Sequence, residues 1–171
     1  YLGHSFAEGD DTLFIFGTRL DPETAVNPAA WSITSKDDKK FGKQKATAVW
    51  RKAKPMNMDN TLTMELDHWI YIQLPKSMKQ GSTYTVTIPE GIDAEDRSAE
   101  VKFDIWNSMS EAVHVNIMGY TPQEETKAAD LYIWLGDGGQ RDYSSYVGKK
   151  VWLYNTATGA KEEVGKVSFW M

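Results

Sequence analysis

Cysteine is absent from this chain of 171 residues. The chain therefore forms no disulfide, no cysteine-ligated metal site and no thiol nucleophile, while its redox compartment stays open. Long apolar runs are absent as well. No stretch approaches the roughly 20 apolar residues of a membrane-spanning helix, so we expect no membrane span.

Basic residues are too few to indicate a nucleic-acid partner. The sequence has 19 lysines and arginines against 24 aspartates and glutamates, which gives a formal net charge of -5 at pH 7. A phosphate backbone and an anionic lipid surface both repel a protein of this sign. We therefore expect neither nucleic acid nor a membrane surface as a partner.

Recognisable catalytic groupings are also missing. His4, His68 and His114 are far apart in the chain and lack the paired spacing of zinc ligands. The serines lack the strand-to-helix turn motif that exposes a nucleophile in hydrolases. The acidic groups Glu8, Asp10 and Asp11 and Asp93, Glu95 and Asp96 have the oxygen ligands that Ca²⁺ takes, but they lack EF-hand spacing, so solvated turns are favoured over a metal site. We expect no cofactor and no catalytic residue, so the chain by itself is predicted not to be an enzyme.

Apolar and aromatic residues, by contrast, are abundant. Hydrophobic residues make up 41% of the chain, which is enough for a packed core, and the sequence contains 7 Trp and 8 Tyr. Large aromatic side chains commonly fill the cores of β-sandwiches and favour strands. The alternative is that some of them stack on sugar rings, because an aromatic face matches the C–H face of a pyranose.

Alternating apolar and polar residues predict a series of short strands. The clearest is 83–88, where Tyr84, Val86 and Ile88 share one face. Turn residues separate about seven or eight such strands before residue 106, and this spacing predicts an all-β sandwich. The expected strands are 12–17, 31–34, 46–51, 61–65, 68–74, 83–88 and 101–105, with a loop at 52–60 and a break at Asp67.

A second unit is expected to begin near Glu111. The stretch 113–117 alternates apolar and polar residues again, and Gly119 and Pro122 end it. The small polar residues of 107–110 mark a short junction between the units. We therefore expect two domains, 1–107 and 111–171. The strands expected in the second are 113–117, 128–135, 150–154 and 164–169, with a hairpin turn at 137–139.

Three motifs of the first unit consist of turn and core residues. They are Leu20-Asp21-Pro22, Asn27-Pro28 with Trp31 and Ile33, and Gly81 with Tyr84, Val86 and Ile88. Together they resemble the bacterial immunoglobulin-like domains of the S-layer type over residues 13–105. This resemblance implies an immunoglobulin-like β-sandwich and carries no activity of its own.

The second unit carries two further motifs. They are Val115-Asn116-Ile117-Met118-Gly119-Tyr120-Thr121-Pro122 with Lys127-Ala128, and Val151-Trp152-Leu153-Tyr154-Asn155-Thr156-Ala157-Thr158-Gly159. Residues 111–171 thereby resemble the N-terminal immunoglobulin-like domain of family-nine glycoside hydrolases, the cellulase type, with Ile117 where that family has Gln. The resemblance implies a second sandwich in a secreted or cell-surface bacterial protein. It carries over no catalytic residue, because the family's acid and base lie in a separate helical barrel.

The same resemblance implies that part of this second sandwich is missing. The family's domain continues with a further corner and closing strands, which are not found in 111–171. A half-sandwich would leave apolar strand edges open. We therefore expect two tandem immunoglobulin-like sandwiches, the second incomplete at its C-terminus, in a polypeptide that continues beyond Met171.

Strands with two large faces supply the candidate binding or interface residues. In 68–74 and 128–135 the aliphatic residues share one side, which is expected to face a core. The opposite, aromatic and polar sides are expected to meet a ligand or a neighbouring domain. The candidates are Asp67, Trp69, Tyr71 and Gln73; Asp130, Tyr132 and Trp134; and Trp152 and Tyr154, which oppose Val151 and Leu153. If strands 128–135 and 150–154 are neighbours, their four aromatic residues form one patch.

Three functions fit these observations. The first is a non-catalytic accessory region of a secreted bacterial carbohydrate-active enzyme, expected to be a glycoside hydrolase, that braces or positions the catalytic domain of the same polypeptide. The second is a carbohydrate-binding module whose outward Trp and Tyr residues bind a polysaccharide. The third is a structural spacer of a cell-surface protein. The motif at 115–122 favours the first function.

Overall fold

The computed structural model describes residues 5–7, 12–17, 20–58, 64–92, 94 and 96–170. Within these residues the regular structure is almost entirely β, and all paired strands run antiparallel. The short helical elements of this part are α1 (Pro22–Ala25) and the 3-10 turns η1 (Pro28–Ala30), η2 (Gly136–Gly138) and η3 (Ser144–Tyr146). The predicted all-β class is confirmed.

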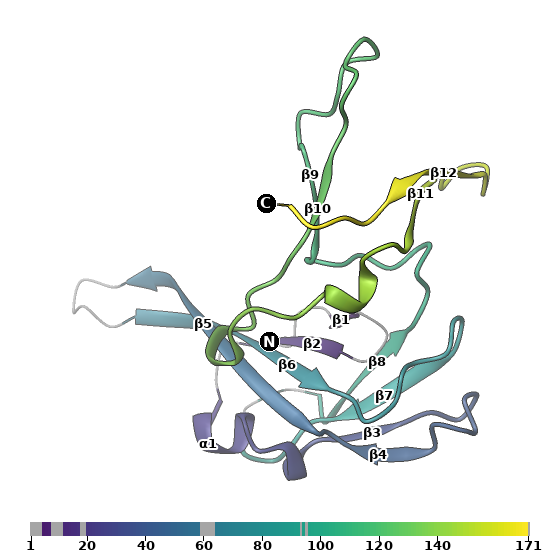
Figure 1. The fold of residues 1–171 in the computed structure, drawn as a ribbon. Coiled ribbons are helices and arrows are strands. Elements are labelled where there is room, and N and C mark those ends of the chain that lie inside the picture. The colour runs from purple at the N-terminus through teal and green to yellow at the C-terminus, as the bar shows by residue number, and fades with distance from the viewer. Residues whose placement is uncertain are drawn as a thin grey trace.

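Two four-stranded sheets make up the lower half of the molecule in Figure 1. Their strands are β1 (Ser5–Ala7), β2 (Thr12–Gly17), β3 (Ser32–Thr34), β4 (Lys43–Lys45), β5 (Ala48–Met58), β6 (Met64–Gln73), β7 (Thr83–Thr87) and β8 (Ser98–Lys102). One sheet has the order β1-β2-β6-β5 and the other the order β4-β3-β7-β8. The arrangement is that of a β-sandwich.

The main core lies between these two sheets and is built by strand alternation. Trp31, just before β3, is fully buried and donates its indole N–H to the Ala25 carbonyl at 2.9 Å. This hydrogen bond gives the indole N–H a partner, so the large ring can be buried without an unsatisfied polar group. The side chains predicted to point inward from 68–74 and 83–88 all lie in this core: Ile70, Ile72, Leu74, Tyr84, Val86 and Ile88.

The long hairpin of β5 and β6 corrects two sequence predictions. β5 continues through Pro55 to Met58, where a loop was expected. It is the last strand of its sheet, and its register with β6 shifts between Pro55 and Asn57. Proline is tolerated at an edge strand or a bulge, so its missing N–H does not end the strand. Asp67 likewise does not interrupt β6, in which it lies opposite Lys54.

The rest of the chain forms two separate ribbons of two strands each. β9 (Val113–Val115) pairs with β10 (Ala129–Leu131), and β11 (Lys150–Tyr154) pairs with β12 (Lys161–Lys166). The β9–β10 hairpin, residues 113–131, is called the arm here, and it extends away from the two sheets toward its tip in Figure 1. Four strands were predicted in this part and four are present with shifted bounds. β10 and β11 are not neighbours in a sheet, however, so the aromatic sides predicted for 128–135 and 150–154 do not lie side by side on one sheet.

Candidate functional site

The aromatic face of β6 is covered by the C-terminal part of the chain. Tyr71 is 0% exposed and belongs to a second buried cluster together with Ala112, Ile133 and Leu135. The half-buried residues packed around this cluster are Trp50, Trp69, Leu131 and Tyr143. The sequence left open whether this face binds a ligand or contacts a neighbouring domain. In the structure it contacts residues 112–143 of the same chain.

A lysine lies over the aromatic rings of the same face. The Lys52 ammonium is 5.0 Å from the ring centroid of Trp69 and 5.4 Å from that of Tyr71. Contacts of this kind stabilise by about 0.5–2 kcal/mol, more when the cation is shielded from water. Asp67 is buried and Gln73 is half-buried, so the four β6 candidates do not form an open platform.

The turn η2 closes the outer edge of β5. Asp137 accepts the backbone N–H of Arg51 through Oδ1 at 2.7 Å. A Cβ added at Gly136 would lie only 2.1 Å from the Arg51 carbonyl oxygen, and one added at Gly138 would lie 2.4 Å from the Trp50 ring. Two glycines therefore allow the turn to approach the strand. The contact shields an edge that would otherwise be free to pair with another strand.

The predicted turn at 137–139 is present, with a second role that the sequence did not indicate. Trp134 and Gln140 form an antiparallel bridge across it, and Leu135 donates its N–H to the Gly139 carbonyl at 2.8 Å. The residues that anchor η2 to β5 were not among the candidates. The one available signal was the excess of glycine around Asp137, since a plain hairpin turn does not need glycine at each of these positions.

A hydrogen-bonded turn joins the two parts of the chain. Asp104 accepts hydrogen bonds from the Asn107 amide at 2.8 Å, from the Gln80 amide at 2.7 Å and from the Trp106 backbone N–H at 3.1 Å. These donors, with Asn107 first, hold the pKa of the Asp104 carboxyl below its usual value. Ile105 also donates its N–H to the Gln80 side-chain oxygen at 3.0 Å. The junction is thus tied to the loop before β7, and the domain boundary there stays a prediction.

Trp106 connects this junction to the ribbon of β11 and β12. Its ring centroid lies 5.3 Å from that of Tyr154, and the Lys161 ammonium lies 3.9 Å from the Trp106 centroid. Trp152, on the same side of β11 as Tyr154, is exposed, with the Lys150 ammonium 5.5 Å from its ring. Tyr154 therefore contacts Trp106 within the chain.

The opposite side of β11 corrects another expectation. Leu153 was predicted to face a core and is 63% exposed. β11 pairs with β12 alone, and their register shifts between Val151 and Trp152. The aromatic side of β11, rather than its aliphatic side, contacts the rest of the chain. Tyr132 and Trp134 lie just after β10, whereas Trp152 and Tyr154 lie in β11, so the four aromatic residues do not form a patch across neighbouring strands as expected.

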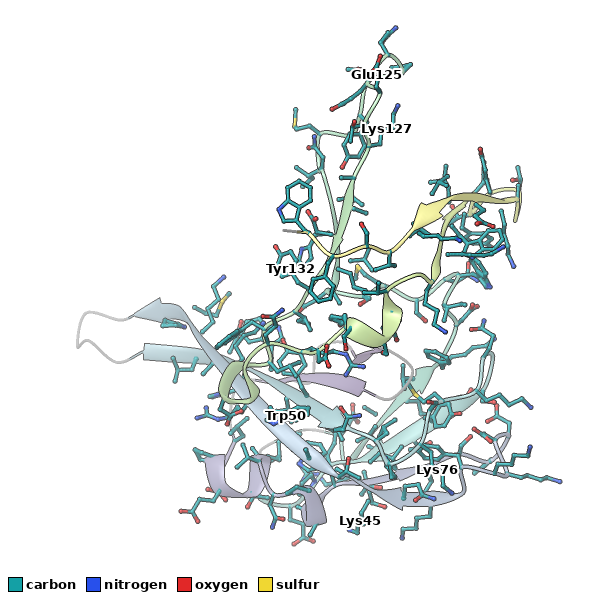
Figure 2. All side chains as sticks on the ribbon, in the orientation of Figure 1. Lys45, Trp50, Lys76, Glu125, Lys127 and Tyr132 are labelled. Carbon is teal, nitrogen blue, oxygen red and sulfur yellow. The ribbon has the colours of Figure 1, made fainter. Side chains whose placement is uncertain are left out.

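Tyr132 and Trp134 are the most exposed of the aromatic candidates, at 53% and 60% exposure. Both point away from Leu131, Ile133 and Leu135, as alternation predicts. The Tyr132 ring stacks on His114, with centroids 3.9 Å apart and an interplanar angle of 10°. Figure 2 shows Tyr132 at the base of the arm, whose far end carries Glu125 and Lys127. Asp130 is also exposed.

The buried His68 of β6 and the half-buried Arg51 of β5 form a polar pair. Arg51 Nη1 lies 3.1 Å from His68 Nδ1. A guanidinium can only donate, so Nδ1 accepts and the imidazole is neutral. Burial first, and the Arg51 charge second, lower the pKa of His68, while Asp67 opposes this shift.

We expect the stability of the protein to fall as the pH drops below about 6.5, the ordinary pKa of histidine. The unfolded chain takes up a proton on His68 in this range and the folded chain resists it, so the loss continues until the pH passes the lowered folded pKa. Urea unfolding at a series of pH values between 7 and 5 measures the effect, and the His68→Gln variant is expected to show a flatter profile. An unchanged profile in that variant would assign the effect to other groups.

The described part of the chain gathers no group of three or more His, Cys, Asp or Glu residues that could hold a metal ion. None of the helices in that part has the length and apolar character of a membrane span. No family model matches the chain, and no curated protein and no solved structure matches it either.

Proposed function

We propose that this chain is a non-catalytic accessory region of a secreted bacterial carbohydrate-active enzyme, a glycoside hydrolase. In this proposal its two parts are tandem immunoglobulin-like sandwiches that brace or position the catalytic domain of the same polypeptide. The motifs in 13–105 and 111–171 support the family assignment.

The burial of Tyr71 between the two parts is the observation that carries the proposal. A brace transmits position only if its own units keep one orientation. The contacts at Tyr71 and at η2 on β5 adjoin each other through Trp50, and the contact at Trp106 lies apart from them. Contacts so distributed restrict rotation about the junction, as a scaffold requires.

Trp134 supplies the test, because it is a large exposed aromatic residue beside the covered interface. Interface centres favour Trp and Tyr, so in the polypeptide that also carries the catalytic domain we expect Trp134 to contact that domain. Trp134→Ala should then lower the melting temperature of that longer polypeptide by a few degrees, measured by scanning calorimetry. Its affinity for polysaccharide should stay unchanged.

A carbohydrate-binding module is the second candidate, and the exposure of both Tyr132 and Trp134 favours it. A sedimentation assay with insoluble cellulose, xylan and mannan separates the two functions. If the 171-residue chain binds one of these polymers and Trp134→Ala abolishes the binding without changing stability, the chain is a binding module. A structural spacer of a cell-surface protein would show neither effect.

A further inference from the structure

We propose that the outer edge of β9 pairs with β9 of a second copy of this chain, which joins two arms into one four-stranded antiparallel sheet. The surface differs from the sites discussed above. It consists of the backbone edge of 113–115 and of the aliphatic face of the arm.

The backbone of β9 has its free hydrogen-bonding groups at the right positions. Tyr132 donates its N–H to the Ala112 carbonyl at 3.0 Å, and the opposed pairs alternate from there. His114 and Asp130 therefore exchange hydrogen bonds, whereas the N–H and C=O groups of Val113 and Val115 point away from β10. β9 has no second neighbour among the described strands.

The aliphatic face of the arm continues the buried cluster around Tyr71. Val113 lies opposite Leu131, and Val115 lies opposite Ala129, so these four side chains share one face of the ribbon. Leu131 packs against the buried cluster, and beyond it the same face runs out into solvent, with Val113 57% and Val115 64% exposed. An apolar face that continues from a buried contact into solvent indicates that a further contact covers its exposed part. A two-stranded ribbon also needs additional strands or packing to be stable in water.

The edge of β9 is better suited to pairing with β9 of a second copy than to pairing with a strand of different sequence. A two-fold axis through His114 sets Val113 of one copy against Val115 of the other, and the outward groups of both residues then form the four ladder bonds. β9 contains no Asp, Glu, Lys or Arg, so the pairing brings no like charges together. Charged side chains protect the other ribbon strands from such pairing: Asp130 in β10, Lys150 in β11, and Lys161, Glu162, Glu163 and Lys166 in β12.

Sedimentation velocity of the full 171-residue chain between about 1 and about 200 µM tests the proposal, because dimers grow with concentration. We expect a dimer that Val115→Pro weakens about tenfold or more, since each copy loses one donated bond and its strand geometry at the edge. Proline there removes only an outward N–H, so the arm itself should persist. Ala129→Pro is the matched control: its N–H points outward on the opposite edge of the arm, and we expect the dimer to be unaffected.

Charge exchange identifies the partner as a second copy. The double variant Val113→Lys with Val115→Lys, and the double variant Val113→Glu with Val115→Glu, are each expected to be monomeric. An equimolar mixture should dimerise again, because every new lysine then lies opposite a glutamate. A wild-type chain that is monomeric at all concentrations, a dimer equally sensitive to Ala129→Pro, or a mixture that stays monomeric while circular dichroism shows folded chains would each overturn the proposal.

Discussion

Replacement of Gly136 by alanine is expected to destabilise the protein by about 2–5 kcal/mol, the sum of a steric cost and a backbone cost. The new Cβ would lie 2.1 Å from the Arg51 carbonyl oxygen and 2.7 Å from the Lys52 Cα. Neither is the end of a flexible side chain, so η2 must leave the edge of β5. The φ angle of 74° at this position adds strain for any residue with a side chain. Urea unfolding followed by tryptophan fluorescence measures the loss.

Gly139→Ala is the matched control for this experiment. Gly139 has a φ angle of 71°, close to that of Gly136, and a Cβ added there would have nothing within 4 Å. Gly139→Ala should therefore lose only the backbone part, about 1–3 kcal/mol, because a ψ angle of -152° at this φ is essentially restricted to glycine. Asp137→Ala should give an intermediate loss, because it removes the acceptor for the Arg51 N–H while leaving both glycines. Equal losses in the Gly136 and Gly139 variants would mean that docking of η2 contributes nothing to stability.

Tyr71→Ala is expected to cost about 3–5 kcal/mol, the range for removing a buried large aromatic side chain. Tyr71 is fully buried, yet it lies outside the main core and holds Ala112, Ile133 and Leu135 against the sheet. The variant should therefore loosen the arm and η2 more than the two sheets. Hydrogen exchange is the appropriate measurement, because it reports the opening of separate regions.

The expected pattern of exchange distinguishes an interface from a core position. Amides of β9, β10 and 132–143 should lose protection in Tyr71→Ala, while amides of β3 and β7 keep theirs. Tyr132→Ala serves as the control, since it removes the same side chain from an exposed place. If protection falls equally in β3 and β7, then the two parts of the chain unfold as one unit and Tyr71 is a core residue in the ordinary sense.

The capped turns show how much local sequence can predict. Asp21-Pro22 and Asn27-Pro28 are turn signals in the sequence, and each begins a short helical turn in the structure. Asp21 accepts the N–H of Thr24 and Asn27 accepts that of Ala29, both at 3.0 Å. In both cases proline occupies the first turn, where no N–H is needed. The information lies within four residues, so the pattern alone suffices.

The errors at Pro55 and Leu153 have one common cause. Proline stops a strand in the middle of a sheet and is tolerated at its edge, and the residues around Pro55 do not reveal that β5 is an edge strand. Leu153 and Tyr154 lie on opposite sides of β11, and alternation does not tell which side will be covered. The contact with Trp106, which is distant in the sequence, settles that choice.

Local sequence patterns predicted the all-β class, the approximate positions of most strands, and the inward side chains of β6 and β7. They did not predict β1, β4 or the full length of β5. The predicted features follow from period-two alternation and from turn residues, which act over a few neighbouring positions. Only the tertiary structure decided that Tyr71 is buried by the second part of the chain, that η2 closes the edge of β5, and that β10 and β11 belong to separate ribbons. Each of these features depends on contacts between segments far apart in the chain that form only on folding. Local sequence does not specify which face of a strand such a contact will bury.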